Sequence, residues 1–230
     1  FAVAAVCAAS AVLFLWLTPP ARGFAPQRRT GATGPSLVAR LTTNLRDRRQ
    51  LALYAQGFLL MGGFVAVYNY LGFHLVAPPY SLPLWVVSFL FLAYLAGTVA
   101  SPWAGSLAAR YGRLAVLLAA LAVMAIGIVV TAVPHVIAVL VGLLILTAGF
   151  FGAHAIASGW APAAARPETR AQAASLYYLG YYGGSSLFGW LLGYAFHDLG
   201  WVGVAGCTLA MVAIAALLAV FGLTAPRRSA

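Results

Sequence analysis

The side chain best suited to chemistry in this sequence is His154, because a histidine inside a long apolar stretch is costly to bury without a role. Thr147, Phe151 and Ser158 lie seven, three and four residues away from it, so the four side chains would share one face of a helix. Such a face could line an aqueous cavity. Histidine titrates near neutral pH, so His154 could carry or sense a proton. The alternative is a packed histidine bonded to a carbonyl or a serine.

Four tyrosines form a second group of candidates. Tyr177, Tyr178, Tyr181 and Tyr182 stand near the start of another apolar stretch. Their rings could stack against an aromatic group or a cation. Tyrosines in such a position more often form a belt at a membrane surface, so this alternative stays open.

A third group, Gln56, Tyr68, Asn69 and Tyr70, lies in the first apolar stretch after residue 50. Buried amides need hydrogen-bond partners, so we expect Gln56 and Asn69 to face other helices or a cavity. Contact with a ligand is open for both. The candidate cavity residues are therefore His154, Ser158, Thr147, Gln56, Asn69, Tyr70, Tyr178 and Tyr182.

The sequence offers no pattern for a metal or redox site. Cys7 and Cys207 lie inside apolar stretches, where cysteine acts as a small packing residue. The three acidic residues, Asp47, Glu168 and Asp198, lie outside the apolar stretches. We expect no metal and no cofactor, and no proton coupling through a carboxylate of this chain.

The composition indicates which elements position these side chains. Hydrophobic residues make up 63% of the chain and charged residues 7%, which leaves too little polar surface for a water-soluble globule. In a bilayer only helices and closed barrels satisfy every backbone polar group, and the alternating pattern of a barrel is absent. Apolar blocks of about 17 to 25 residues suit helices that cross a bilayer. We therefore predict an all-α fold, a polytopic transmembrane helical bundle.

The blocks predict seven spans in four regions. Residues 1–18 form one span that ends at two prolines, and residues 19–50 form a polar linker. A six-span domain occupies residues 51–225, and a short tail follows at 226–230. The six blocks of this domain are 51–73, 84–104, 114–133, 136–157, 173–196 and 201–223.

The arginines predict the orientation of the spans. All 13 basic residues are arginines, and with alternating spans every one falls on the same side: seven in the linker, two in each of two connections and two in the tail. Cytoplasmic loops are rich in such residues, so we predict a cytoplasmic linker and carboxyl terminus in a bacterial inner membrane. The net charge of +10 therefore does not indicate a nucleic-acid partner, which requires a basic patch on a soluble domain.

The connection at residues 105–113 reads GSLAARYGR and resembles the G-x-L-a-D-r-x-G-r signature of the major facilitator superfamily. Its place, between the second and third span after the linker, and its predicted cytoplasmic side match that family. The resemblance implies the last helix of an amino-terminal half whose beginning is missing, a cytoplasmic linker and a six-helix carboxyl-terminal half. The motif residues are Gly105, Leu107, Arg110, Gly112 and Arg113.

Each motif residue has an expected physical role. Gly105 would let two helices approach closely, and Gly112 would permit a tight turn. Arg110 and Arg113 would hold the loop at the lipid headgroups. In the family an acidic residue latches one conformation through this loop, and Ala109 stands at that position here. We therefore expect no charged latch from this half.

Two stretches, 68–80 and 149–160, resemble the YnfM-type exporter subfamily. The resemblance implies a secondary active transporter, not an enzyme, that moves a small solute by alternating access and exports it at the cost of an ion gradient. Its partners would be the lipid bilayer, the solute and the amino-terminal half of the same transporter, with no nucleic acid.

Two other functions are weighed against transport. The span count alone permits a multi-pass receptor or assembly protein. A hydrolase using Ser185 or Ser186 with His154 lacks a clean nucleophile motif and an acidic partner. In the same stretch, glycines at 180, 184, 189 and 193 predict close contact with a neighbouring helix.

Overall fold

The computed structural model describes residues 2–19 and 36–224, and every regular element in these ranges is a helix. The chain divides into two units, Phe1–Pro35 and Ser36–Ala230. Helix α1 (Ala2–Leu17) belongs to the first unit and is apolar throughout. The prediction of an all-α, polytopic helical bundle is confirmed.

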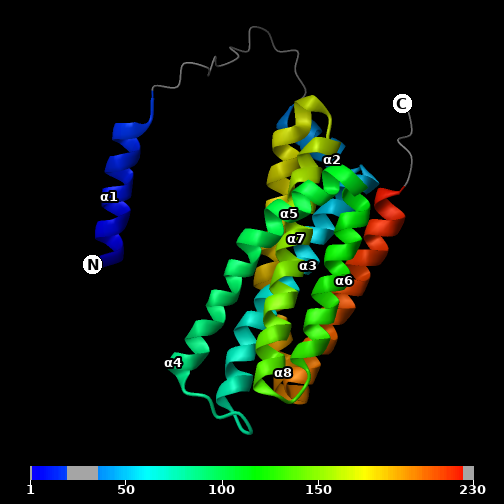
Figure 1. The fold of residues 1–230 in the computed structure, drawn as a ribbon. Coiled ribbons are helices and arrows are strands. Elements are labelled where there is room, and N and C mark those ends of the chain that lie inside the picture. The colour runs from blue at the N-terminus through cyan, green and yellow to red at the C-terminus, as the bar shows by residue number, and fades with distance from the viewer. Residues whose placement is uncertain (1, 20–35, 225–230) are drawn as a thin grey trace. The chain divides into compact units, whose positions relative to one another are not determined.

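The second unit contains the remaining helices. Five helical stretches of the described residues are long and apolar enough to cross a membrane. The last of them includes Gly200, whose φ of 62° interrupts the helix, and the chain reverses there (Figure 1), so this stretch supplies two spans. The helices are α2 (Leu37–Leu45), α3 (Arg48–Val76), α4 (Leu84–Val87), η1 (Ser88–Tyr94), α5 (Leu95–Tyr111), α6 (Arg113–Thr131), α7 (Val136–Ala164), η2 (Pro167–Thr169) and α8 (Arg170–Leu223).

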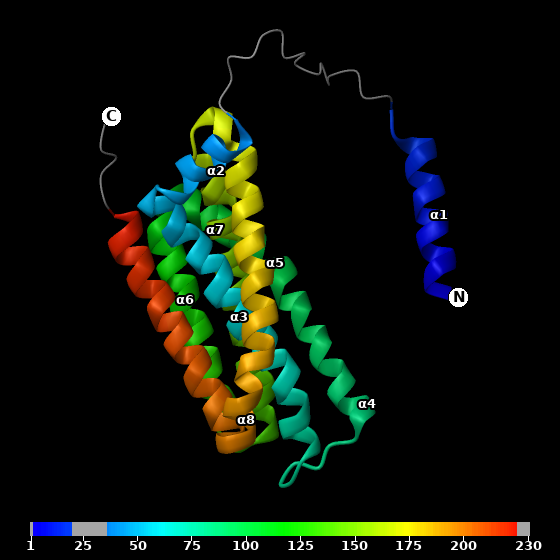
Figure 2. The same cartoon turned by 180° about the vertical axis from the view of Figure 1, so that it is seen from behind.

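The connections alternate between the two ends of this unit. In Figures 1 and 2, α2, the junction of α5 with α6, and the connection from α7 to α8 gather at one end. The α3–α4 and α6–α7 connections and the reversal at Gly200 lie at the other end. The arginines of the described unit lie in or beside the elements of the first end. The arrangement therefore keeps these arginines out of the middle of every span.

Helices α3 and α8 approach each other closely through glycines, as the spacing predicts. A Cβ placed on Gly184 would collide with the carbonyl oxygen of Phe58, and one placed on Gly180 would lie 3.1 Å from the carbonyl oxygen of Tyr54. From the opposite side, a Cβ on Gly62 would lie 3.0 Å from the Gly184 carbonyl oxygen. Without side chains at these positions the two backbones pack directly against each other.

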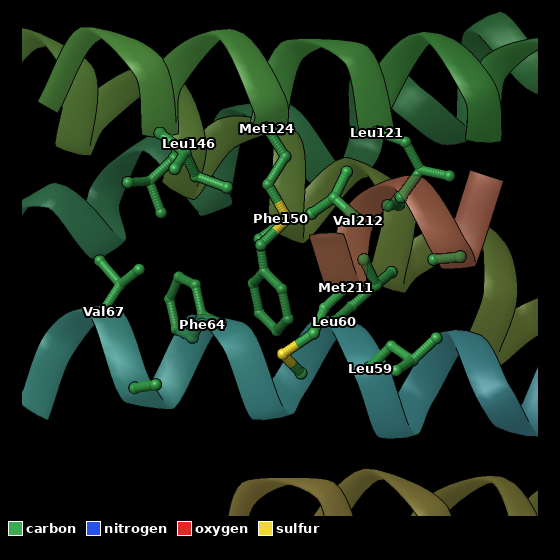
Figure 3. Close-up of a cluster of buried hydrophobic side chains, with 14 of the residues drawn as sticks. Leu59, Leu60, Phe64, Val67, Leu121, Met124, Leu146, Phe150, Met211 and Val212 are labelled. Carbon is green, nitrogen blue, oxygen red and sulfur yellow. The ribbon is translucent and has the colours of Figure 1, made fainter. Parts of the chain in front are cut away.

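The apolar core lies where α3, α6, α7 and the second arm of α8 meet (Figure 3). The rings of Phe64 in α3 and Phe150 in α7 stack with centroids 3.9 Å apart. Helices α6 and α7 also touch through glycine, because a Cβ on Gly142 would lie 2.6 Å from the backbone nitrogen of Thr131. The core thus joins all of these spans.

Helix α2 lies within the predicted linker and was not anticipated from the sequence. It begins after Ser36, whose hydroxyl accepts a hydrogen bond of 3.2 Å from the Ala39 N–H. The Asn44 amide donates to the Thr169 carbonyl at 3.1 Å, and the Thr169 hydroxyl donates to the Asn44 amide oxygen at 3.3 Å. These bonds fasten α2 to η2. Residues 20–35 of the predicted linker lie outside the described ranges.

Replacing Gly184 by alanine is expected to destabilise the bundle. Alanine favours a helix over glycine by about 0.5–1 kcal/mol, but overpacking against a rigid backbone costs about 1–3 kcal/mol. The neighbouring Gly183→Ala is the control, because a Cβ there meets its nearest atom at 4.0 Å. Thermal unfolding in detergent should show a lower Tm for G184A alone. Equal Tm values would show that the α3–α8 contact adapts to the extra methyl group.

Candidate functional site

His154 lies half-buried on α7, and its bonding partner is a tyrosine on α8. The His154 Nδ1 and the Tyr177 hydroxyl are 3.0 Å apart, and Tyr177 is almost completely buried. The sequence analysis named a carbonyl or a serine as the alternative partner, whereas the structure shows a tyrosine. Among the described residues, no hydrogen bond joins His154 to Ser185 or Ser186, the pairing that a hydrolase would require.

Aromatic rings surround the His154 imidazole. The ring of Phe150 lies parallel to it at 5.8 Å, and that of Tyr181 lies 4.9 Å away. Tyr178 approaches edge-on at 6.4 Å. The predicted group of tyrosines at the start of α8 is therefore brought together around this histidine.

Residues Ser88–Tyr94, in the first half of the second span, form a 3₁₀ helix, η1. Block 84–104 predicts a continuous α-helix there. Residues three apart are aligned in a 3₁₀ helix, so Ser88, Phe91 and Tyr94 stand in one row. A neighbouring row is buried, and it consists of Val87, Leu90 and Ala93. This burial with a period of three follows from the 3₁₀ geometry.

The row on η1 faces Tyr68 of α3. The Tyr68 ring lies 5.8 Å from that of Phe91 and 4.9 Å from that of Tyr94. The Tyr68 hydroxyl is hydrogen-bonded to that of Thr147 on α7 at 2.9 Å. Tyr68 thus connects three spans, although the candidate cavity residues drawn from the sequence do not include it.

The predicted polar stripe on α7 does not line one open cavity. Thr147 is fully buried in its bond with Tyr68. Phe151 packs against Gly97, where a Cβ would collide with its ring. The Ser158 hydroxyl donates to the Ala155 carbonyl at 3.4 Å. Of the stripe, His154 is the member that reaches the tyrosines of α8.

Ring contacts join these side chains into one continuous group, which we call the aromatic cluster. Phe151 lies 5.7 Å from Tyr94 on one side and 5.2 Å from Phe150 on the other, and Phe150 continues to His154. Some of its rings are buried against the core, whereas others are exposed. The cluster consists of Tyr68, Phe91, Tyr94, Phe150, Phe151, His154, Tyr177, Tyr178, Tyr181 and Tyr182, of which Phe91, Tyr94, Tyr178 and Tyr182 are exposed.

The remaining cavity candidates have other contacts. Gln56 is fully buried, as expected, and its amide donates to the Ala215 carbonyl at 2.8 Å. The Tyr70 hydroxyl donates to the Gly189 carbonyl at 2.8 Å. Asn69 is exposed, and its amide nitrogen lies 3.4 Å from where a Cβ on Gly189 of α8 would stand. Gln56 and Tyr70 therefore fasten α3 to α8.

A small cavity lies beside Tyr68, between α3 and the outer part of the second span. Its lining combines one phenol and one serine with apolar side chains and a glycine. The lining residues are Tyr68, Gly72, Leu84, Val87, Ser88, Leu90 and Phe91.

The motif loop between α5 and α6 agrees with its expected turn. Gly112 has a φ of 86°, a region that favours glycine, and its N–H donates to the Ala108 carbonyl at 3.0 Å. The Arg110 guanidinium lies 5.2 Å from the centre of the Tyr111 ring. Leu107 and Arg113 are exposed.

The expected close approach at Gly105 is not found within the described part of the chain. A Cβ placed on this residue meets nothing within 4 Å. By contrast, its neighbour Ala104 is buried, and a Cβ on Gly152 would lie 3.7 Å from the Ala104 methyl group. At this level Ala104, and not the motif glycine, is in van der Waals contact with α7.

No family model matches this chain, but several curated proteins are similar to it. It is 42% identical over 217 residues to the inner membrane transport protein YnfM of Escherichia coli K12, which covers 94% of this chain and 51% of the relative. It is 34% identical over 207 residues to the MFS-type transporter YybF of Bacillus subtilis 168, covering 90% and 50%. An uncharacterized transporter of Buchnera aphidicola from Schizaphis graminum is 34% identical over 209 residues, covering 91% and 50%.

The chain spans about half the length of the curated relatives it matches. All three are named as transporters and not as enzymes. The apolar helices and the name of the first relative place the chain in a membrane as a multi-pass protein. From its sequence, its helical bundle and these relatives, the chain belongs to the major facilitator superfamily of membrane transporters.

Proposed function

We propose that this chain forms the carboxyl-terminal six-span half of a secondary active carrier, together with the linker and the last span of the amino-terminal half. The carrier exports a small solute across the bacterial inner membrane by alternating access, coupled to an ion gradient. The observation that carries this proposal is the match of 94% of the chain to about half of a named inner membrane transport protein. Six spans of one half suit a carrier whose two halves rock about a central site.

The motif loop and the arginine-bearing end face the cytoplasm in this proposal. Eight arginines of the second unit, at 40, 46, 48, 49, 110, 113, 166 and 170, belong to elements of that end. The opposite end contains His135, His197 and Asp198. Such asymmetry supports a cytoplasmic linker and carboxyl terminus, because translocated loops are poor in arginine.

The pair of His154 and Tyr177 supports a role in proton coupling. A neutral His154 with its proton on Nε2 accepts the phenol proton at Nδ1, whereas a protonated His154 donates from Nδ1 to the phenol oxygen. Since a phenol both donates and accepts, the bond persists in both states with its direction reversed. A proton can then enter and leave this histidine while the hydrogen bond to Tyr177 is kept.

The exposed side of the aromatic cluster is the proposed surface for the solute. Tyr94 on η1 and Tyr178 and Tyr182 on α8 present their rings outward. No carboxylate or arginine lies among the cluster residues. Such a surface favours a flat aromatic solute, neutral or cationic, which binds by stacking and by cation–π contact.

Labelling of single cysteines tests the orientation. With Cys7 and Cys207 replaced by alanine, cysteines are introduced for Glu168 and Asp198, two exposed residues at opposite ends of the bundle. In intact cells a membrane-impermeant maleimide should label the cysteine at 198 and leave that at 168 unlabelled until the membrane is disrupted. The reverse result would invert the orientation, and labelling of both from outside would contradict the span count.

A flux assay on the complete transporter in proteoliposomes tests the proton role. Accumulation driven by a pH gradient should be lost in His154→Ala, and facilitated downhill exchange should remain. Tyr177→Phe keeps the ring but removes the hydroxyl, so gradient-driven flux should fall by about tenfold or more. His135→Ala, at the exposed end of α7, is the control and should behave as the parent. Gradient-driven flux unchanged in both H154A and Y177F would refute the proton role.

Substitution of the exposed tyrosines tests the solute surface. Tyr182→Ala is expected to raise the KM for ethidium, an aromatic cation used as the probe, by about twofold to thirtyfold, because one stacking contact contributes about 0.5–2 kcal/mol. Tyr194→Ala is the control, since this residue is also exposed on α8 but lies outside the aromatic cluster, with its ring edge-on to Trp190. An equal KM for the parent and Y182A would exclude this ring from the solute surface, and a parent that transports no aromatic solute would refute the proposed solute class.

A further inference from the structure

We propose that α2 is a membrane-surface helix whose apolar face rests in the headgroup layer of an anionic phospholipid leaflet. The face consists of Leu37, Val38, Leu41 and Leu45. Leu37, Leu41 and Leu45 are spaced by four residues and therefore lie along one side of the helix, with Val38 beside them. This inference requires that the bundle spans the membrane, and it does not depend on the solute or on the direction of transport.

The face is apolar and open in the described unit. Leu37, Val38 and Leu45 are 63%, 70% and 47% exposed, whereas Leu41 is partly covered. Four apolar side chains out of nine residues on one side would be unfavourable in water. An apolar neighbour on this side would remove that cost.

The position of α2 is fixed at the level of the lipid headgroups. Asn44 is 2% exposed and forms two hydrogen bonds with Thr169, which anchors the end of α2 to the connection before α8. Only Arg46 and Asp47 separate α2 from Arg48, which begins α3, a helix long and apolar enough to cross the membrane. The Gln50 amide also donates to the Ala161 carbonyl near the end of α7, at 3.0 Å. A helix held between two span ends lies at the membrane surface, where lipid is its nearest apolar environment.

The charges beside α2 favour anionic lipid over neutral lipid. Arg46 and Arg48 are exposed at the end of α2, and Arg166 and Arg170 are exposed on either side of η2. Of the acidic residues, Asp47 and Glu168 belong to this region, and the Asp47 carboxylate accepts a hydrogen bond of 2.9 Å from the Arg49 N–H. The surplus of arginine matches the negative headgroups of an anionic leaflet, where each basic residue strengthens attachment about fivefold.

The test compares two adjacent residues of α2 in the complete transporter. Cys7 and Cys207 are replaced by alanine, and a nitroxide is attached to a cysteine at Val38, on the apolar face, or at Ala39, which is exposed on the other side of the helix. Each protein is placed in nanodiscs of phosphatidylcholine with phosphatidylglycerol, or of phosphatidylcholine alone. Paramagnetic resonance then measures collisions with oxygen, which dissolves in lipid, and with a water-soluble nickel chelate.

We expect the label at 38 to collide mainly with oxygen and the label at 39 mainly with nickel, with a larger difference in the anionic nanodiscs. The Arg46→Gln, Arg48→Gln double variant should remove the effect of phosphatidylglycerol. Equal nickel accessibility at 38 and 39 would overturn the proposal, because both sides of α2 would then face water. Protection of the label at 38 from both oxygen and the nickel chelate in both lipids would also overturn the proposal, since another part of the protein would then cover the apolar face. An oxygen preference identical in the two lipids would overturn the part that concerns anionic headgroups.

Discussion

The close contact of α3 with the first arm of α8 is the constraint on which the site depends. Between spans in lipid, shape and hydrogen bonds hold helices together, because lipid tails are as apolar as the helix surfaces. Gly184 permits the backbones to touch, and Gly57 leaves room for the buried ring of Tyr177, which lies 3.2 Å from where a Cβ would stand. Because the Tyr177 ring is held there, its hydroxyl meets His154 on α7. A packing interface thereby fixes the polar pair.

Contacts between spans also hold the rest of the aromatic cluster in place. His154 connects α7 to α8, and Tyr68 connects α3 to both α7 and η1. Each polar group in these contacts has a partner from a different span. A rearrangement of one of these spans relative to the others would break hydrogen bonds as well as ring contacts, so the proposed movement would keep them together as one rigid part.

Features that depend on local sequence were predictable, and those that depend on distant partners were not. Block length located the spans, and the glycine spacing located the contact at Gly184. The partner of His154 was missed because Tyr177 lies 23 residues away on another helix. Helix α2 was missed because its anchor, Thr169, lies 125 residues from Asn44.

The 3₁₀ segment also has a consequence for how far its span reaches. A 3₁₀ helix rises about 2.0 Å per residue and an α-helix about 1.5 Å, so the seven residues of η1 extend further by about 3.5 Å than the same residues in α-form. They also wind through about 140° more, at about 120° per residue instead of about 100°. The hydrogen-bond pattern of η1 therefore sets where Leu84 lies along the span axis as much as the number of residues does. It also sets which side of α4 faces its neighbours.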